Sequence, residues 1–400
     1  MLSQILIAIF SGIFFGIITG LTPGIHVNLI SVFVLGASSY LLKYFNLIDL
    51  CIFLVAMSIT HIFLDSIPSI FLGAPEAGTE LGVLPGHRYL LKGNGYMAVK
   101  LTIVGAFFAL VISILIFPLT VWLVGKIYGI ISDYIGYFLA AIMAFMIIKD
   151  RNKIWAFLIF LISGIFGVIV LNMPNLKDPL FPMLSGMFGI STLLISLNSN
   201  QKIPEQKIST EIKVDTKKTI QALSSGQFSG FMTSVLPGIG ASTAAVMAMQ
   251  ITRKLGDHGF MVLMGAASMV NFVLSIGTLY SINKARNGII VAISEIMQNI
   301  SVTDIMFLLF SALVTAGIAV FLGLKIGKVF SGIMDKIDYN KVVIGVIIFI
   351  IILVFVFSGF LGLFIIVVST AIGILPALKK VTRTHGMACL VLPVMLYYLL

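Results

Sequence analysis

The chain has 400 residues, of which 59% are hydrophobic and only 10% are charged, and its mean hydropathy is +1.14. Soluble domains carry about 25% charged residues, so this composition excludes an ordinary soluble protein. Its uncharged runs are long enough for helices of about 20 residues, the length that a bilayer requires. The sequence therefore predicts an all-α polytopic membrane protein.

The formal charge of +10 comes from basic residues in short clusters between apolar runs. In membrane proteins such clusters reflect orientation, so we expect no nucleic-acid partner. The two cysteines, Cys51 and Cys389, lie inside apolar runs and are expected to be buried, forming neither a disulfide nor a metal site. No Lys or Arg precedes Lys43, so we expect the first apolar segment to be retained and not cleaved as a signal peptide.

Residues 1–42 contain no charged side chain and have the pair Pro23-Gly24 near their centre. Proline interrupts the helical hydrogen bonds and glycine lets the chain turn. The sequence predicts a re-entrant helical hairpin here, with its Pro-Gly tip at mid-membrane. Residues 45–99 are apolar but broken by Asp65, Glu76 and Glu80, and we interpret them as one interrupted crossing.

The rest of the first half consists of four uncharged runs, each expected as one crossing because an ionisable side chain in hydrocarbon is expensive. They are residues 101–125, 134–148, 154–176 and 179–201. A polar linker over residues 198–218 follows, and it separates a first repeat (1–197) from a second one (219–400).

The second half repeats this order. Residues 219–252 are uncharged around Pro237-Gly238, and the arm 239–252 is about 21 Å of helix, which is short for a crossing. Residues 255–300 are expected as one interrupted crossing, broken at Lys284 and Arg286. Residues 305–324, two crossings in 342–378 that separate near Gly359, and 386–400 complete the chain.

Each half is thus a hairpin plus five crossings, and an odd number of crossings makes the two repeats inverted. With the linker in the cytoplasm, 20 of the 25 Lys and Arg residues lie on the cytoplasmic side, and three, Lys43, Lys126 and Lys177, lie outside. This bias supports the orientation and predicts a plasma-membrane protein with both termini outside. The repeat is also visible in the prolines, since Pro23 and Pro237 are 214 residues apart and Pro182 and Pro393 are 211 apart.

Inverted repeats with broken helices are typical of secondary transporters, whose substrates bind at mid-membrane. A helix that starts at a Pro-Gly tip presents free N–H groups and a positive dipole end, which favour an anion. The candidate substrate-binding residues at the two tips are Pro23, Gly24, His26, Asn28, Pro237, Gly238, Gly240, Ser242 and Thr243. The alternative is that these small residues only permit close helix packing.

The interrupted crossings add further candidates. Lys284 and Arg286 are costly inside a bilayer, and arginine suits bidentate binding of a carboxylate or phosphate. The alternative is an ordinary outer-loop cluster or an ion pair with Glu76 or Glu80. Asn271, Ser275 and Thr278 share one helix face, and Asn287 follows the break. Asp65, Glu76 and Glu80 are candidates for coupling to Na⁺ or H⁺, with a solvated loop face as the alternative.

These regions resemble the TctA-like large membrane subunits of tripartite tricarboxylate transporters. The resemblance lies in residues 20–28 and 230–243, in the segment from Ile67-Pro68 to Lys92-Gly93, and in Gly265 through Asn271 to Asn287. It implies an ion-driven permease for an organic anion, with a small membrane subunit and an extracytoplasmic binding protein as partners.

Other functions remain open. Transporters of polyprenyl-phosphate lipid carriers also pair Pro-Gly re-entrant hairpins, so a phosphorylated lipid is the alternative substrate, and a channel is a further one. Motifs of intramembrane proteases, such as Gly-x-Ser-x-Gly with a histidine or His-Glu-x-x-His, do not occur in the sequence, so we expect no enzyme, no catalytic residue and no cofactor beyond a coupling ion. Membrane lipids and a second copy in a homodimer are the remaining expected partners.

Overall fold

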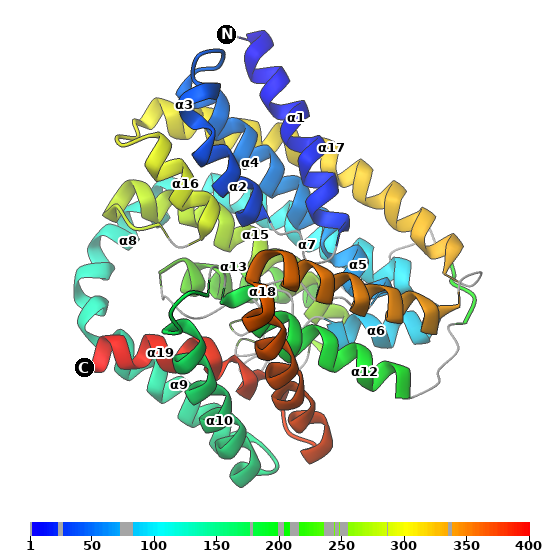
Figure 1. The fold of residues 1–400 in the computed structure, drawn as a ribbon. Helices are drawn as coiled ribbons and strands as arrows, with labels where there is room; N and C mark the ends of the chain where they lie inside the picture. Colours follow the sequence, from blue (N-terminus) through cyan, green and yellow to red (C-terminus); the bar gives the residue numbers. More distant parts are fainter. Residues whose placement is uncertain are drawn as a thin grey trace.

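The computed structural model describes residues 2–22, 27–72, 83–176, 179–198, 204–208, 216–235, 244, 248, 255–285, 287–334 and 338–400 (Figure 1). Eight of the helices in these ranges are long and apolar enough to cross a membrane. They are Leu2–Leu21, Leu47–Phe71, Gly95–Leu115, Phe117–Lys149, Lys153–Leu171, Gly256–Ile282, Val302–Ile333 and Asn340–Lys379. The prediction of an all-α polytopic membrane protein is confirmed.

The first half begins with α1 (Leu2–Leu21) and α2 (Val27–Gly36), the two arms on either side of the Pro23-Gly24 pair. The elements that follow are α3 (Ser38–Leu41), α4 (Leu47–Leu64), α5 (Ser66–Phe71), α6 (Val83–Leu91), α7 (Gly95–Leu115), α8 (Phe117–Ile131), η1 (Ser132–Tyr134), α9 (Ile135–Lys149), α10 (Lys153–Leu171), α11 (Leu180–Leu184), the π-helical turn η2 (Ser185–Ile190) and α12 (Ser191–Asn198).

The second half contains α13 (Thr216–Val235), α15 (Gly256–Ile282), α16 (Gly288–Ile296), α17 (Val302–Ile333), α18 (Tyr339–Lys379), η3 (Arg383–Met387) and α19 (Ala388–Leu399). α18 has a sharp break at Gly359, whose φ of 64° and ψ of −159° are not helical. Only glycine adopts this conformation readily. The two crossings expected in residues 342–378 therefore meet at this glycine.

The interrupted crossing expected over residues 255–300 is different in the structure. α15 is an uninterrupted helix of 27 residues, and the polar break follows it. The helix ends because Asn283 adopts a left-handed conformation with φ of 52°, a common way to terminate a helix. The short helix α16 then starts separately at Gly288. Lys284 thus lies after the crossing and not inside it.

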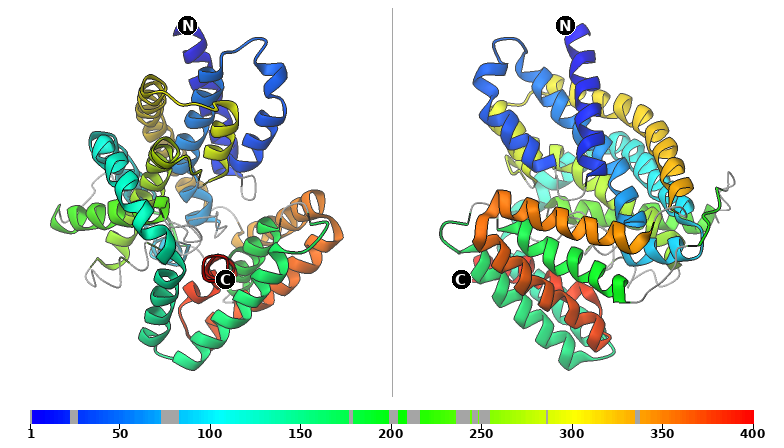
Figure 2. Two further views of the ribbon diagram at one scale, coloured as in Figure 1. Left: turned by 90° about the vertical axis from the view of Figure 1, so that its left-hand side faces the viewer. Right: turned by 45° about the vertical axis from the view of Figure 1, so that its right-hand side comes forward.

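The helices form two bundles that are each built from both halves of the chain (Figure 2). The larger bundle contains α1 to α8 and α13 to α17, and its buried side chains form the main hydrophobic core. The smaller bundle contains α9 to α12, α18 and α19, with its own apolar clusters. Buried residues on one face of α18, Val343, Ile350 and Val354, join the main core and connect the bundles.

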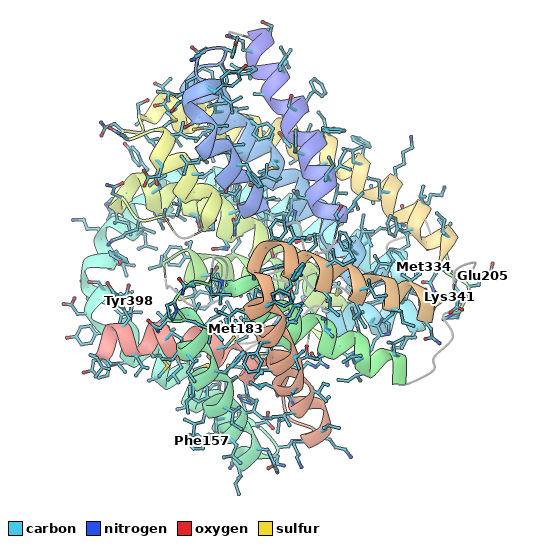
Figure 3. All side chains as sticks on the ribbon, in the orientation of Figure 1. Phe157, Met183, Glu205, Met334, Lys341 and Tyr398 are labelled. Carbon is cyan, nitrogen blue, oxygen red and sulfur yellow. The ribbon has the colours of Figure 1, made fainter. Side chains whose placement is uncertain are left out.

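Large hydrophobic side chains are exposed on many of the described helices, among them Phe157 (Figure 3). Phe157 on α10 points outward with 51% of its surface exposed, whereas Met183 on α11 is fully buried. Many large hydrophobic side chains on α1, α17 and α18 are exposed in the same way. Large exposed apolar surfaces are rare on soluble monomers, and here they fit contact with lipid.

Helices α1 and α13 contact their partners in matching ways. A Cβ atom on Gly12 of α1 would lie 2.7 Å from the Cβ atom of Ala56 on α4, and one on Gly226 of α13 would lie 2.4 Å from that of Ala266 on α15. Gly12 and Gly226 are 214 residues apart, and Ala56 and Ala266 are 210 apart. The next turn repeats the match: Gly16 meets Thr60, and Gly230 meets Val270, with the same two separations.

A second matched pair lies in the smaller bundle. A Cβ atom on Gly167 of α10 would lie 1.9 Å from the carbonyl oxygen of Cys389, and one on Gly373 of α18 would lie 2.0 Å from that of Met187. In the same two helices, Ser163 donates a hydrogen bond to the His385 carbonyl at 3.1 Å and Ser369 donates one to the Pro182 carbonyl at 3.1 Å. Small residues thus bring both helix pairs together at the backbone.

Candidate functional site

The N-terminal ends of α2 and α16 meet, although they come from different halves of the sequence. A Cβ atom on Gly288, the first residue of α16, would lie 2.7 Å from both Cγ and Oδ1 of Asn28 in the first turn of α2. Asn287 caps α16, because its Oδ1 accepts a hydrogen bond from the Ile290 N–H at 2.9 Å. The N-terminal ends of the two helices, where their positive dipole ends lie, are therefore close together.

Two of the predicted site residues, Asn28 and Asn287, are brought together in this way. Lys284 lies a few residues before α16 and has an exposed side chain. The other residues predicted for this site lie outside the described residues: Pro23, Gly24, His26, Pro237, Gly238, Gly240, Ser242, Thr243 and Arg286. The same holds for the carboxylate candidates Glu76 and Glu80.

Asn271, Ser275 and Thr278 share one face of α15, as their spacing predicts. Ser275 donates a hydrogen bond to the Asn271 carbonyl at 2.6 Å, and Thr278 donates one to the Ser275 carbonyl at 2.9 Å. Both hydroxyl groups are completely buried and bond to their own helix. These hydrogen bonds therefore do not connect this face of α15 with Asn28 or Asn287.

Asp65 lines a small cavity, and the sequence indicated only Asp65 itself among its polar side chains. It lies between α4 and α5, and its side chain is 6% exposed. The cavity has a volume of about 20 Å³, and its polar side chains are Asp65, Ser66, Ser69, Thr102 and Ser268. The spacing of Asp65, Ser66 and Ser69 puts these polar groups together in one segment, but the contributions from α7 and α15 have no signal in the sequence.

A second buried polar cluster lies outside the membrane-spanning segments, where the loop after α9 meets η3. His385 Nε2 lies 3.0 Å from Asp150 Oδ2, and both side chains are at most 3% exposed. Burial alone would raise the pKa of Asp150, but hydrogen bonds from the Thr382 and Asn152 N–H groups and from His385 lower it to about 2. Burial lowers the pKa of His385, and Asp150 offsets this only in part.

The linker is attached to the first half through Gln206, which is buried. Its side chain donates to the Leu90 carbonyl and accepts from the Gly95 N–H, each at 3.0 Å. Lys207 N–H donates to the Gly93 carbonyl at 2.7 Å, and Gly93 has the positive φ of 72° that this turn requires. Arg88 in α6 forms a salt bridge of 2.6 Å with Asp257 at the start of α15. The turn between α6 and α7, the linker and the start of α15 therefore lie together.

Comparisons with known proteins agree with this architecture. The chain is 30% identical over 400 residues, 97% of each chain, to the uncharacterized protein MJ1079 of Methanocaldococcus jannaschii. No solved structure matches it. Residues 6–388 match the family described as the Tripartite tricarboxylate transporter TctA family, a family of transporter components and not of enzymes. The chain is thus a multi-pass membrane protein that belongs to the TctA transporter family.

Proposed function

We propose that the protein is the permease of a secondary transporter for an organic carboxylate, moved by ion-coupled alternating access. The observation that carries this proposal is the meeting of the α2 and α16 N-termini at Asn28 and Gly288. Two positive helix ends at one place favour an anionic group, as in transporters with broken helices. The TctA family match over residues 6–388 supports a carboxylate as that anion.

Alternating access requires parts that can move relative to each other, and we infer inverted repeats over residues 1–197 and 219–400. Two sets of matched glycine contacts support this repeat. The matched glycines of α1 and α13 are 214 residues apart, and Gly167 of α10 and Gly373 of α18 are 206 apart. The division into two bundles supports a relative movement, because close backbone packing lies mostly within each bundle. The surface of α18 that joins them is apolar, and an apolar surface has no hydrogen bonds to break when it slides.

We further propose partners and an orientation. The family name describes a tripartite transporter, which supports a small membrane subunit and an extracytoplasmic binding protein; a homodimer is also proposed. We propose that both termini lie outside the plasma membrane. Single cysteines at the exposed positions Asn46 and Lys380, in a background without Cys51 and Cys389, test the orientation. A membrane-impermeant thiol reagent should label Asn46→Cys only from outside and Lys380→Cys only from the cytoplasm, and labelling of both from one side would refute the inverted arrangement.

Substrate binding by the purified full-length chain tests the function. Citrate and dicarboxylates should bind saturably and enter proteoliposomes, and Arg286→Gln should abolish this while Arg286→Lys restores only part, since lysine lacks the planar fork. Arg151→Gln, at an exposed loop position, is the matched control and should leave uptake unchanged. Equal uptake by Arg286→Gln and wild type would remove Arg286 from the site.

The alternative substrate is a polyprenyl phosphate, which shares the anionic head group but adds a lipid tail. The exposed apolar faces of the helices are compatible with a tail that stays in the bilayer. Binding of undecaprenyl phosphate by the same preparation, with no binding of any di- or tricarboxylate, would replace the carboxylate proposal by this one. Passive currents through single molecules, without saturation by either substrate, would instead indicate a channel.

A further inference from the structure

Asp65 is a buried carboxylate inside a membrane-spanning segment, Leu47–Phe71. Its side chain is near the backbone N–H of Ser66, and among the residues that the structure describes it has no cationic partner. A buried charge is expensive unless it is paired. The group must therefore be neutralised by a bound cation or by a proton.

The surroundings of Asp65 offer oxygen ligands and space. The cavity of about 20 Å³ holds one particle of the size of a water molecule. Thr102 Oγ1 lies 2.8 Å from the Val99 carbonyl and 3.0 Å from Ser66 Oγ. When Thr102 donates its proton to that carbonyl, it accepts the proton of Ser66, so Ser66 keeps both lone pairs for another ligand.

A third hydroxyl group comes from the second half of the chain. Ser268 of α15 lines the cavity, and its Oγ is buried without a hydrogen-bond partner within the described ranges. A buried polar atom without a partner is costly. Such a hydroxyl group beside a carboxylate is therefore available to bind a cation. Its position is set by the close approach of α7 and α15, where a Cβ atom on Gly265 would lie 2.1 Å from the Thr102 carbonyl.

We propose that this cavity binds one sodium ion, with Asp65 supplying the balancing charge and the hydroxyl groups of Ser66, Ser69, Thr102 and Ser268 supplying neutral oxygen ligands. Hard cations prefer oxygen ligands, and a single carboxylate matches a single positive charge. The described residues contain no group of three or more His, Cys, Asp and Glu side chains suited to a metal ion, which argues against a divalent ion. The small volume favours Na⁺ over the larger K⁺.

The site also has a direct connection to the first hairpin. α4, which ends at Leu64 beside Asp65, packs against the last turn of α1: a Cβ atom on Gly20 would lie 2.8 Å from the Leu64 Cβ atom. Gly20 precedes the Pro23-Gly24 tip by three residues. Sodium bound at Asp65 would thus stabilise the contact from which the hairpin extends. Its role as the coupling ion rests on the proposed transport function, whereas its binding does not.

Sodium binding can be measured without any substrate. Purified full-length protein in detergent is heated in NaCl, KCl or choline chloride at constant ionic strength. Wild type should gain thermal stability in Na⁺ alone, in a saturable manner, because a ligand that binds only the folded state stabilises it. Asp65→Asn should lose this response, and Ser268→Ala should raise the half-saturating Na⁺ concentration by roughly tenfold, the equivalent of one lost ligand.

Asp49 provides the matched control on the same helix. It is a buried carboxylate with a structural role, since its Oδ2 accepts a hydrogen bond from the Asn46 N–H at 3.1 Å in a capping box. Asp49→Asn should keep the sodium response of wild type. Equal stabilisation by all three salts, or an unchanged sodium response in Asp65→Asn, would overturn the site.

Uptake measurements distinguish the sodium site from the proposed carboxylate transport. Sodium-stimulated citrate uptake that Asp65→Asn abolishes supports both. Citrate uptake that needs no Na⁺ and persists in Asp65→Asn overturns the coupling role and leaves the transport function intact. Uptake driven by a pH gradient alone, but lost in Asp65→Asn, assigns Asp65 to a proton and overturns the sodium site. A specific sodium response without uptake of any carboxylate upholds the site and overturns the carboxylate function.

Discussion

Replacing Gly167 or Gly373 by alanine should destabilise the protein by a similar amount. A new Cβ atom would lie 1.9 Å from the Cys389 oxygen in the first case and 2.0 Å from the Met187 oxygen in the second, and Cβ atoms essentially never approach closer than 3.0 Å. Each helix pair must therefore separate by about 1 Å. The obstacle is backbone, which cannot rotate away as a side chain can.

The expected loss follows from two opposing effects. Overpacking costs about 1–3 kcal/mol, and a clash with backbone belongs at the upper end of this range. Alanine has a higher helix propensity than glycine, which stabilises the variant by up to about 1 kcal/mol. The net loss is therefore about 2 kcal/mol for each variant, which lowers the midpoint of thermal unfolding by a few degrees.

The assay compares these variants with alanine at two helical glycines that have open space around them. Gly317 and Gly345 have no atom within 4 Å of an added Cβ, so Gly317→Ala and Gly345→Ala should be neutral or slightly stabilising. Thermal unfolding of the purified proteins in one detergent gives the four midpoints. A lower unfolding midpoint for only one of Gly167→Ala and Gly373→Ala would contradict the equivalence of the two contacts. Midpoints equal to those of the control variants for both would contradict the close backbone approach.

Four further outcomes are expected. The shifted pKa values of Asp150 and His385 make the unfolded chain bind more protons than the folded one, so thermal stability should fall as the pH drops below about 6.5. A wild-type unfolding midpoint that is constant from pH 7.5 to 5.5 would contradict this pH dependence. Asp150→Asn should lower the free energy of unfolding by roughly 2 kcal/mol at pH 7. Gly288→Ala should press on Asn28 and weaken citrate binding roughly tenfold without lowering the unfolding midpoint; undiminished binding would separate this contact from the site. An alanine at Gly359 would meet no neighbouring atom, but φ of 64° with ψ of −159° is a conformation that essentially only glycine adopts, so Gly359→Ala should cost about 1–3 kcal/mol in chemical unfolding. A neutral result would mean that the break in α18 adapts.

The membrane class and most helix positions could be predicted from the sequence, because charge is expensive in hydrocarbon and therefore marks where helices end. The break near Gly359 was predictable for a similarly local reason, since glycine permits a conformation that other residues avoid. The same local reasoning failed at residues 101–125, which were expected as one crossing but are divided between α7, which ends at Leu115, and α8, which begins at Phe117. It also failed at residues 255–300. Charged side chains at Lys284 and Arg286 were interpreted as an interruption within a crossing, but α15 ends before them at Asn283.

The contacts between distant segments were decided only by the tertiary structure. Nothing near Asn28 indicates that Gly288 lies against it, and Asp150 carries no local signal for His385. The cavity at Asp65 is completed by Thr102 and Ser268 from other helices. A side chain's partners depend on how helices pack, and packing is a property of whole helix surfaces; the sequence by itself determined which segments enter the membrane, whereas packing decided which polar groups meet there.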